Sequence, residues 1–151
     1  MTSEDRYASA SRVIRADAAT IFELIADPAR QPEWDGNDNL VSAPEGQRIT
    51  AVGDVFVMRI HLGSDRENHV VEFDEGRLIA WRPSEIGKPQ PGHLWRYELA
   101  PHDAGTTTVT HSYDWSQLTD ENRMGRARRT DADVLAASLE RLAHMVEKPR
   151  G

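Results

Sequence analysis

The segment HLWRYELAPHDAGTTTVTHSYDW, residues 93–115, contains two stretches in which side chains of different character alternate. A period of two is typical of a β-strand with one buried and one solvated face. The intervening sequence PHDAG is turn-like, so the two stretches are predicted to form a β-hairpin. One face of this hairpin collects the large rings, on His93, Trp95, Tyr97, His111, Tyr113 and Trp115.

The register of the hairpin follows if PHDAG forms the turn, because opposed residues then have numbers that sum to about 206. The expected pairs are His93–Tyr113, Trp95–His111, Tyr97–Val109 and Leu99–Thr107. Arg96 and Glu98 fall on the opposite face, with Thr110 and Thr108, where polar side chains meet water.

The chain before this hairpin predicts a strand over 8–14, a helix, and then further strands. Asp17 occupies an N-cap position, and the apolar side chains of residues 21–25 recur with helical spacing. Pro28 is expected to end that helix, and a second short helical turn follows up to Trp34. The strands are expected in NDNLVSAPEGQ, DVFVMRIHL, ENHVVEF and LIAW, with DEGR as a hairpin turn and PSEIGKPQPG as a loop.

The end of the chain predicts an amphipathic helix. Leucines and a valine recur at helical spacing at Leu135, Leu139, Leu142 and Val146. Thr130 and Asp133 resemble a capping box at its start. The preceding basic cluster RMGRARR, residues 123–129, is expected to be a solvated lead-in to the helix; contact with a phosphate or an acidic partner is the alternative.

This order of elements predicts an α+β fold with an antiparallel sheet, since consecutive strands are joined by short turns. A sheet of this kind needs one covered face, and only the terminal helix is long enough to lie across it.

Three segments carry a resemblance to a known family: VIRADAATIFELIADPARQPEWD, FDEGRLIAWRPS and GHLWRYELAPHDAGTTTVTHSYDW. With the order of elements, they resemble the START-like superfamily, also called Bet v 1-like or SRPBCC, and in it the polyketide cyclase/dehydrase and lipid-transport group. The resemblance implies a single helix-grip domain over residues 7–147, with residues 1–6 and 148–151 as flexible termini. It implies a seven-stranded antiparallel sheet wrapped around a long C-terminal helix, with two short helices after the first strand. It also implies a cavity between sheet and helix that binds a hydrophobic or aromatic small molecule, lipid- or polyketide-like.

The bulk composition excludes several classes of function. The 151 residues carry a net charge of −7, which disfavours nucleic acid and anionic membranes as partners. The absence of cysteine excludes disulfides and thiol chemistry. We expect a cytoplasmic protein with no membrane insertion, because neither a secretory signal nor a spanning apolar run is found. We further expect no cofactor, no metal, and a monomer or weak homodimer.

The ligand-binding candidates are the rings of the hairpin and inward positions of other elements. A core built for stability alone prefers side chains without polar atoms, so the imidazoles, phenols and indole suggest a pocket. The candidates are Trp95, Tyr97, His111, Tyr113, His93, Trp81, Phe73, Phe56, Met58, Leu135, Leu139 and Leu142. Ordinary core packing is the alternative for each, above all for the two phenylalanines and the three leucines. For Trp34, with Asp35, capping of the cavity mouth and anchoring of a turn remain open.

Two other functions compete with binding. In a cyclase or dehydratase, His111 is the candidate general base, since imidazole titrates near neutral pH. No carboxylate is placed to orient it, because Asp114 falls on the opposite face. An interaction protein related to the Hsp90-ATPase activator branch would need an apolar patch on the outer face of the sheet. The histidines show no metal-ligand spacing, although His69, His93 and His111 are all expected to face inward.

Overall fold

The computed structural model describes residues 6–34, 40–60 and 64–147. Within these residues, seven strands form one antiparallel sheet in the order β1-β7-β6-β5-β4-β3-β2. The strands are β1 (Tyr7–Ile14), β2 (Leu40–Ser42), β3 (Val55–Ile60), β4 (Asp65–Asp74), β5 (Leu78–Glu85), β6 (Leu94–Pro101) and β7 (Thr107–Asp114). The helices are α1 (Ala18–Ala26), the short 3-10 helix η1 (Pro28–Glu33), α2 (Glu121–Arg129) and α3 (Ala132–Val146). The predicted α+β helix-grip fold is confirmed.

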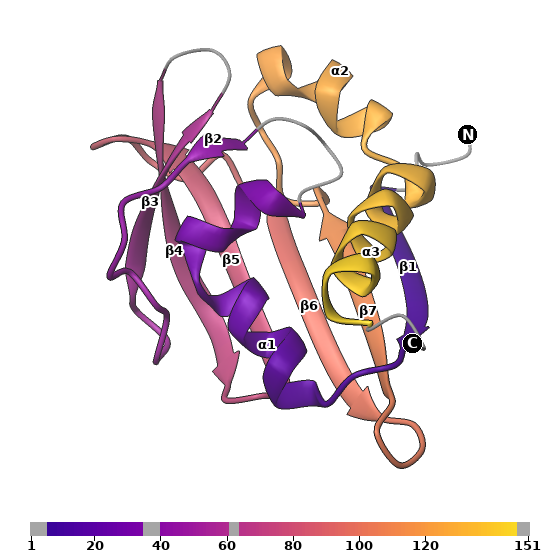
Figure 1. The fold of residues 1–151 in the computed structure, drawn as a ribbon. Coiled ribbons are helices and arrows are strands. Elements are labelled where there is room, and N and C mark those ends of the chain that lie inside the picture. The colour runs from indigo at the N-terminus through magenta and orange to yellow at the C-terminus, as the bar shows by residue number, and fades with distance from the viewer. Residues whose placement is uncertain (1–5, 35–39, 61–63, 148–151) are drawn as a thin grey trace, which may run out of the picture.

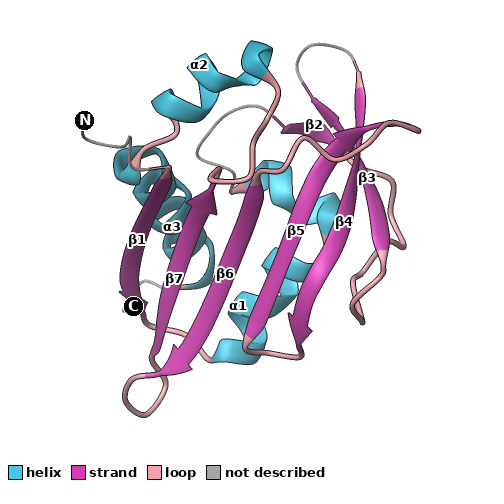
Figure 2. Ribbon diagram, turned by 180° about the vertical axis from the view of Figure 1, so that it is seen from behind, coloured by secondary structure: helices cyan, strands magenta, loops and turns pink. Residues whose placement is uncertain are grey.

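Helices α1 and α3 lie on the same face of the sheet, and the other face is uncovered (Figure 1). Figure 2, from behind, shows the bare strands with both helices beyond them. Helix α3 packs on β1 and β7, whereas α1 contacts β6 and α3. The predicted apolar stripe of α3 is buried, with Leu135, Leu139 and Leu142 at most 1 % exposed. No helix among the described residues is long and apolar enough to cross a membrane.

The β6–β7 hairpin has the predicted faces but not the predicted register. The observed pairs are Trp95–Tyr113, Tyr97–His111, Leu99–Val109 and Pro101–Thr107, and none of the four predicted pairs forms. The turn is centred one residue later than expected, because Thr106 N–H donates to Asp103 C=O (3.0 Å) and Gly105 takes a positive φ of 75° between them. The error moves each partner by two positions, so every side chain keeps its face.

Strand β4 contains a β-bulge that the sequence pattern did not reveal. Its register against β5 shifts between Val70 and Glu72, which interrupts the alternation of faces. Val70 is buried and Phe73 packs against the core, whereas Val71 is exposed. The expectation that His69 faces inward is therefore wrong, whereas Phe73, beyond the bulge, packs against the core as an inward position would.

The predicted loop PSEIGKPQPG begins inside β5, which continues through Pro83 to Glu85. Pairing of β5 with β6 ends at Trp81 and Trp95, so the remainder of β5 is an edge on that side. A proline is tolerated at such an edge because no ladder hydrogen bond there needs its missing N–H.

Helix α3 begins one residue later than the predicted capping box. Asp131 is the N-cap, and its carboxylate accepts from Val134 N–H (3.1 Å). The box of Thr130 and Asp133 is wrong because Thr130 ends α2, where its N–H and its hydroxyl both donate to Arg126 C=O. The charged segment expected to be a lead-in is thus a separate helix.

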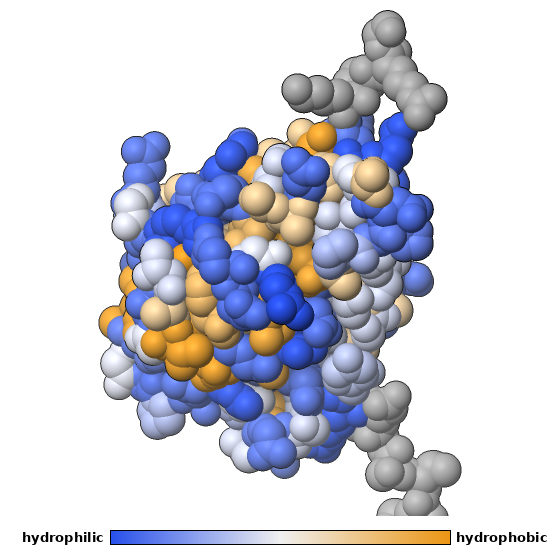
Figure 3. Space-filling model, turned by 90° about the horizontal axis from the view of Figure 1, so that it is seen from below, coloured by the Kyte–Doolittle hydropathy of each residue, from blue (hydrophilic) through white to orange (hydrophobic). Residues whose placement is uncertain are grey.

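The uncovered face of the sheet is polar along the hairpin, where Arg96 forms ion pairs with Glu72 and Glu98. Near β3 and β4 it carries exposed apolar side chains, on Val52, Val55 and Val71. The view from below shows hydrophobic side chains gathered on one part of the surface (Figure 3).

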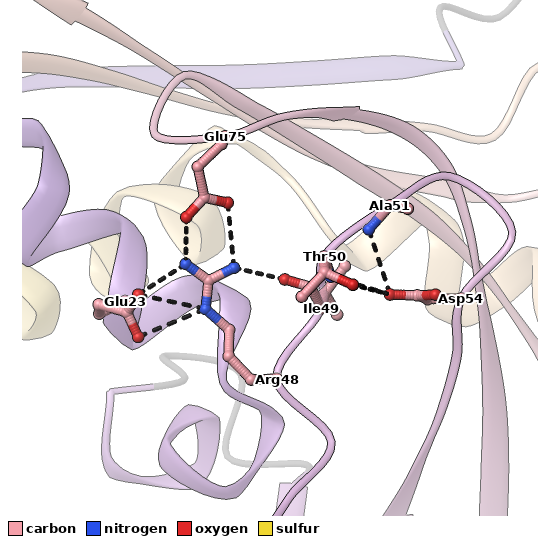
Figure 4. Close-up of polar contacts among 7 residues, drawn as sticks. All are labelled: Glu23, Arg48, Ile49, Thr50, Ala51, Asp54 and Glu75. Atoms are coloured by element: carbon pink, nitrogen blue, oxygen red, sulfur yellow. Dashed lines mark hydrogen bonds and ion pairs between the residues drawn. The ribbon is translucent and has the colours of Figure 1, made fainter.

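Arg48 ties α1 to the β4–β5 turn (Figure 4). Its guanidinium forms ion pairs with Glu23 of α1 (2.6 Å) and Glu75 of the turn (2.5 Å), and donates to Ile49 C=O. It also lies 5.5 Å from the centroid of the Phe22 ring. The hydrogen bond between Arg48 and Glu23 raises the pKa of the arginine and lowers the pKa of the glutamate.

Arg48→Ala is expected to lower the free energy of unfolding by about 1–2 kcal/mol, from exposed ion pairs and one cation–π contact. The folded-state pKa of Glu23 lies below its ordinary value of 4.5. The ion-pair contribution is therefore complete above about pH 4.5 and is lost as the pH falls through the lowered pKa. Urea unfolding of wild type and variant at pH 7 and pH 3 measures this difference. The difference in the free energy of unfolding between wild type and Arg48→Ala should be smaller at pH 3 than at pH 7. Arg77→Ala, in the same turn, should lower the free energy of unfolding less than half as much at pH 7.

Candidate functional site

A cavity of about 130 Å³ lies against the inner face of the sheet, beneath η1 and α2. Strands β3 to β7 supply most of its wall, and Gln31, Trp34, Arg123 and Arg126 come from the two helices. No described residue of α3 lines it. The cavity was expected between the sheet and the C-terminal helix. That expectation is wrong, because the cavity lies under η1 and α2 instead. The leucines of α3 belong to the packed clusters of buried side chains and not to the wall of this cavity.

The wall of the cavity is a continuous group of stacked rings on β5, β6 and β7. The centroid distances are 5.9 Å for Trp81–Tyr97, 3.9 Å for Tyr97–His111, 5.7 Å for Trp95–His111 and 4.4 Å for Trp95–Tyr113. The observed register produces this group, because it sets Trp95 beside Tyr113 and Tyr97 beside His111. Contacts between such rings add about 0.5–1.5 kcal/mol each to the burial of their area.

His111 lies at the centre of this group with both ring nitrogens engaged. Nδ1 lies 3.3 Å from the carbonyl oxygen of Arg96, and Nε2 lies 3.2 Å from the hydroxyl of Tyr97. Since a carbonyl only accepts, Nδ1 carries the proton and Nε2 accepts from the phenol. Burial lowers the pKa of His111 to about 3, so the ring is neutral at neutral pH.

His93 lies just before β6, with its ring 6.0 Å from that of Tyr113. Its side chain lines the cavity, and Nδ1 is buried without a hydrogen-bond partner among the described residues. Burial, reinforced by Arg123 and Arg126, lowers the pKa of His93 to about 4. An unpaired buried nitrogen of this kind costs about 1–3 kcal/mol unless water or a ligand contacts it.

Three arginines approach the cavity from its solvent side, Arg66 from β4 and Arg123 and Arg126 from α2. Arg123 pairs with Asp120 (3.1 Å) and with Glu85 (3.5 Å). The interpretation of this basic cluster as a solvated lead-in missed both α2 arginines as lining residues. Their i,i+3 spacing, which places two side chains on one side of a helix, was the signal that could have found them.

Seven of the twelve predicted binding residues line the cavity. Five are the stacked rings of Trp81, Trp95, Tyr97, His111 and Tyr113, and the other two are His93 and Met58.

The other five predicted residues are not in the lining and belong to the packed core. Phe56 stands edge-on to Trp81 and Phe73 edge-on to Phe22. The three leucines, Leu135, Leu139 and Leu142, hold α3 on the sheet.

Trp34 anchors the turn, which is one of the two roles that the sequence left open, and it lies in the wall of the cavity. Its indole N–H donates to Leu24 C=O (3.0 Å), which anchors the turn after η1, and its ring also lines the cavity. The partner residue Asp35 lies outside the described residues. Gln31, which the sequence did not indicate, lines the cavity beside it and donates to Ile25 C=O (2.9 Å).

The described part of the chain holds no group of three or more His, Asp or Glu side chains that could bind a metal ion. The three histidines considered together do not converge. His69 points away from the cavity and lies 3.2 Å from the hydroxyl of Ser84.

Comparisons with known proteins agree with this architecture. The sequence profile of the family described as "Polyketide cyclase / dehydrase and lipid transport" matches residues 7–147. An uncharacterised protein of Mycobacterium tuberculosis is 28 % identical over 109 residues, which are 71 % of this chain and 46 % of that protein. The chain thus spans about half the length of the curated relatives it matches.

Solved structures with the same fold come from distant organisms. The Aha1 dimer of Colwellia psychrerythraea superposes with a TM-score of 0.64 at 16 % identity, over 96 % of this chain and 98 % of that one. A ginseng major latex-like protein from Panax ginseng superposes with a TM-score of 0.62 at 15 % identity, over 94 % and 97 % of the two chains. At these identities the likeness concerns the fold alone.

The buried histidines predict a pH dependence of stability. Their folded-state pKa values, about 3 and about 4, lie below the ordinary 6.5, so the unfolded chain binds more protons between these values. The stability from neutral imidazoles is therefore full above about pH 6.5 and declines as the pH falls towards 4. Urea unfolding at pH 7, 6 and 5 should show a loss of up to about 1.4 kcal/mol per pH unit for each histidine.

His111→Gln tests this dependence, because glutamine can accept from Tyr97 and donate to Arg96 C=O as the imidazole does. The variant is expected to keep the fold and to reduce the slope of stability against pH between 7 and 5. An unchanged slope in both His111→Gln and His93→Gln would contradict a neutral, buried state for these side chains.

Proposed function

Because the chain belongs to the polyketide cyclase / dehydrase and lipid transport family, we propose that its cavity binds a small hydrophobic molecule that contains an aromatic ring. The ring-lined wall of the cavity carries this proposal. Flat ligands gain from offset or edge contacts with stacked aromatic side chains, beyond the burial of their area.

The volume of the cavity limits the size of the ligand. Apolar protein cavities of about 150 Å³ hold benzene, so about 130 Å³ suits a single ring. Polar groups of the wall supply orientation. Burial raises the pKa of Tyr113 to about 12, which keeps its hydroxyl a neutral donor. Among the described residues, neither this hydroxyl nor the indole N–H of Trp95 has a hydrogen-bond partner.

Binding without turnover fits the chemistry of the site better than catalysis. A general base works best when its pKa lies near the working pH. The pKa of His111 is lowered to about 3, and both of its nitrogens are already engaged. Asp114 does not orient it, since its carboxylate accepts from Ser116 N–H (2.9 Å). We therefore favour a carrier or sensor over a cyclase or dehydratase.

Titration with 3-phenylpropanamide, a neutral molecule with one ring, tests the proposal. We expect saturable binding by calorimetry and chemical-shift changes confined to the cavity wall in two-dimensional NMR. Met58→Trp should abolish binding, because the larger side chain fills the cavity from β3. Leu40→Trp blocks the same space from β2 and serves if Met58→Trp does not fold.

Val55→Trp is the matched control, since it adds the same bulk to β3 at an exposed position. It should bind like wild type. Binding that survives both blocking variants, or an absence of binding to the wild type, would overturn the cavity as the site.

A further inference from the structure

We propose that the natural ligand carries a carboxylate, held at the solvent side of the cavity by Arg66, Arg123 and Arg126, with His93 beneath them. The inference rests on the proposed function, in which the aromatic wall holds the ring of the ligand. It makes the ligand an aromatic or hydrophobic carboxylic acid.

The three guanidinium groups come from two elements, β4 and α2, and line the same cavity although like charges repel. Their mutual influence is evident in the pKa of Arg66, which burial lowers most and which the charges of Arg123 and Arg126 lower further, against the opposing charge of Glu85. Convergence of this kind is costly in the free protein and favourable once an anion arrives.

Among the described residues, the acidic side chains near this cluster pair with Arg123 rather than with Arg66 or Arg126. Glu85 and Asp120 both pair with Arg123, and Glu85 also pairs with Lys88 (2.9 Å). Arg66 donates to the hydroxyl of Ser64 (2.8 Å), a neutral partner.

The guanidinium of Arg126 makes no hydrogen bond or ion pair within the described part of the chain, although its backbone carbonyl accepts from Thr130. A planar guanidinium is the side chain best suited to two parallel hydrogen bonds with a carboxylate. The chain as a whole has a net charge of −7, so this excess of positive charge is a local feature of the cavity.

His93 provides an independent observation at the same place. Its side chain is only 9 % exposed, lines the cavity, and leaves Nδ1 without a partner among the described residues. A neutral imidazole carries one N–H donor, and the carboxylate oxygen of a ligand beside the arginines would accept it. The cost of the unpaired nitrogen in the empty site would then be recovered on binding.

The experiment compares 3-phenylpropionate with 3-phenylpropanamide, which differ in charge and have nearly the same shape. We expect the acid to bind at least about tenfold more tightly at low salt, with a preference that declines as salt screens the arginines. Arg126→Gln should reduce this preference at least about threefold and leave the affinity for the amide unchanged. The imidazole ¹⁵N resonance of His93 should shift with the acid and not with the amide.

Arg129→Gln is the matched control, because it removes the same charge from the same helix at an exposed position outside the lining. It should keep most of the preference for the acid. Thermal unfolding of both variants shows that each is folded.

The outcomes separate this inference from the proposed function. If the amide binds and the acid binds no more tightly, the carboxylate site is overturned and the aromatic cavity stands. If the acid is preferred equally by wild type, Arg126→Gln and Arg123→Gln, the arginines do not hold the carboxylate and the inference fails. If neither molecule binds, the proposed function itself fails.

Discussion

The backbone pairing of β6 with β7 is the constraint on which the cavity depends. It places Tyr97 opposite His111 and Trp95 opposite Tyr113, so four rings from two strands lie on one face. The central imidazole is tolerated in a buried position because the phenol and a backbone carbonyl satisfy both of its nitrogens. Two further rings pack on Tyr97: Trp81 from β5, and Trp34 from the turn after η1.

The cavity exists because the helices cover the sheet unequally. A helix is about 10 Å wide and covers about two strands, which are spaced about 4.8 Å apart. Helix α3 packs on the strands β1 and β7, where its leucines belong to the packed clusters of buried side chains. Over the other strands, α1 contacts β6 and η1 contacts β2 and β3, and residues of η1 and α2 line the space that remains. The open volume therefore lies away from the long helix.

The charge of the molecule is also distributed unequally. The acidic chain places two arginines of α2 at the cavity, and His93 there is neutral because protonation would cost hydration and would be opposed by the charges of the arginines. A neutral aromatic wall beneath a positive rim is complementary to a molecule with an apolar body and an anionic end. An acid–base mechanism has less support, because the imidazole best placed for it has no free nitrogen.

The sequence by itself determined which side chains of each strand and helix face the core. Alternation assigned the faces of the hairpin, helical spacing assigned the buried stripes of α1 and α3, and seven of the twelve proposed binding residues line the cavity. The tertiary structure alone decided two features of the sheet. One is the register of the β6–β7 hairpin, which depends on the conformation of Gly105, and the other is the bulge that reverses the faces of β4. It also decided that α2 brings Arg123 and Arg126 to Arg66. The bulge and the position of α2 depend on contacts between residues far apart in the chain, which no local pattern of side chains shows. The register depends on the backbone conformation of the turn, which the alternation of side chains does not show.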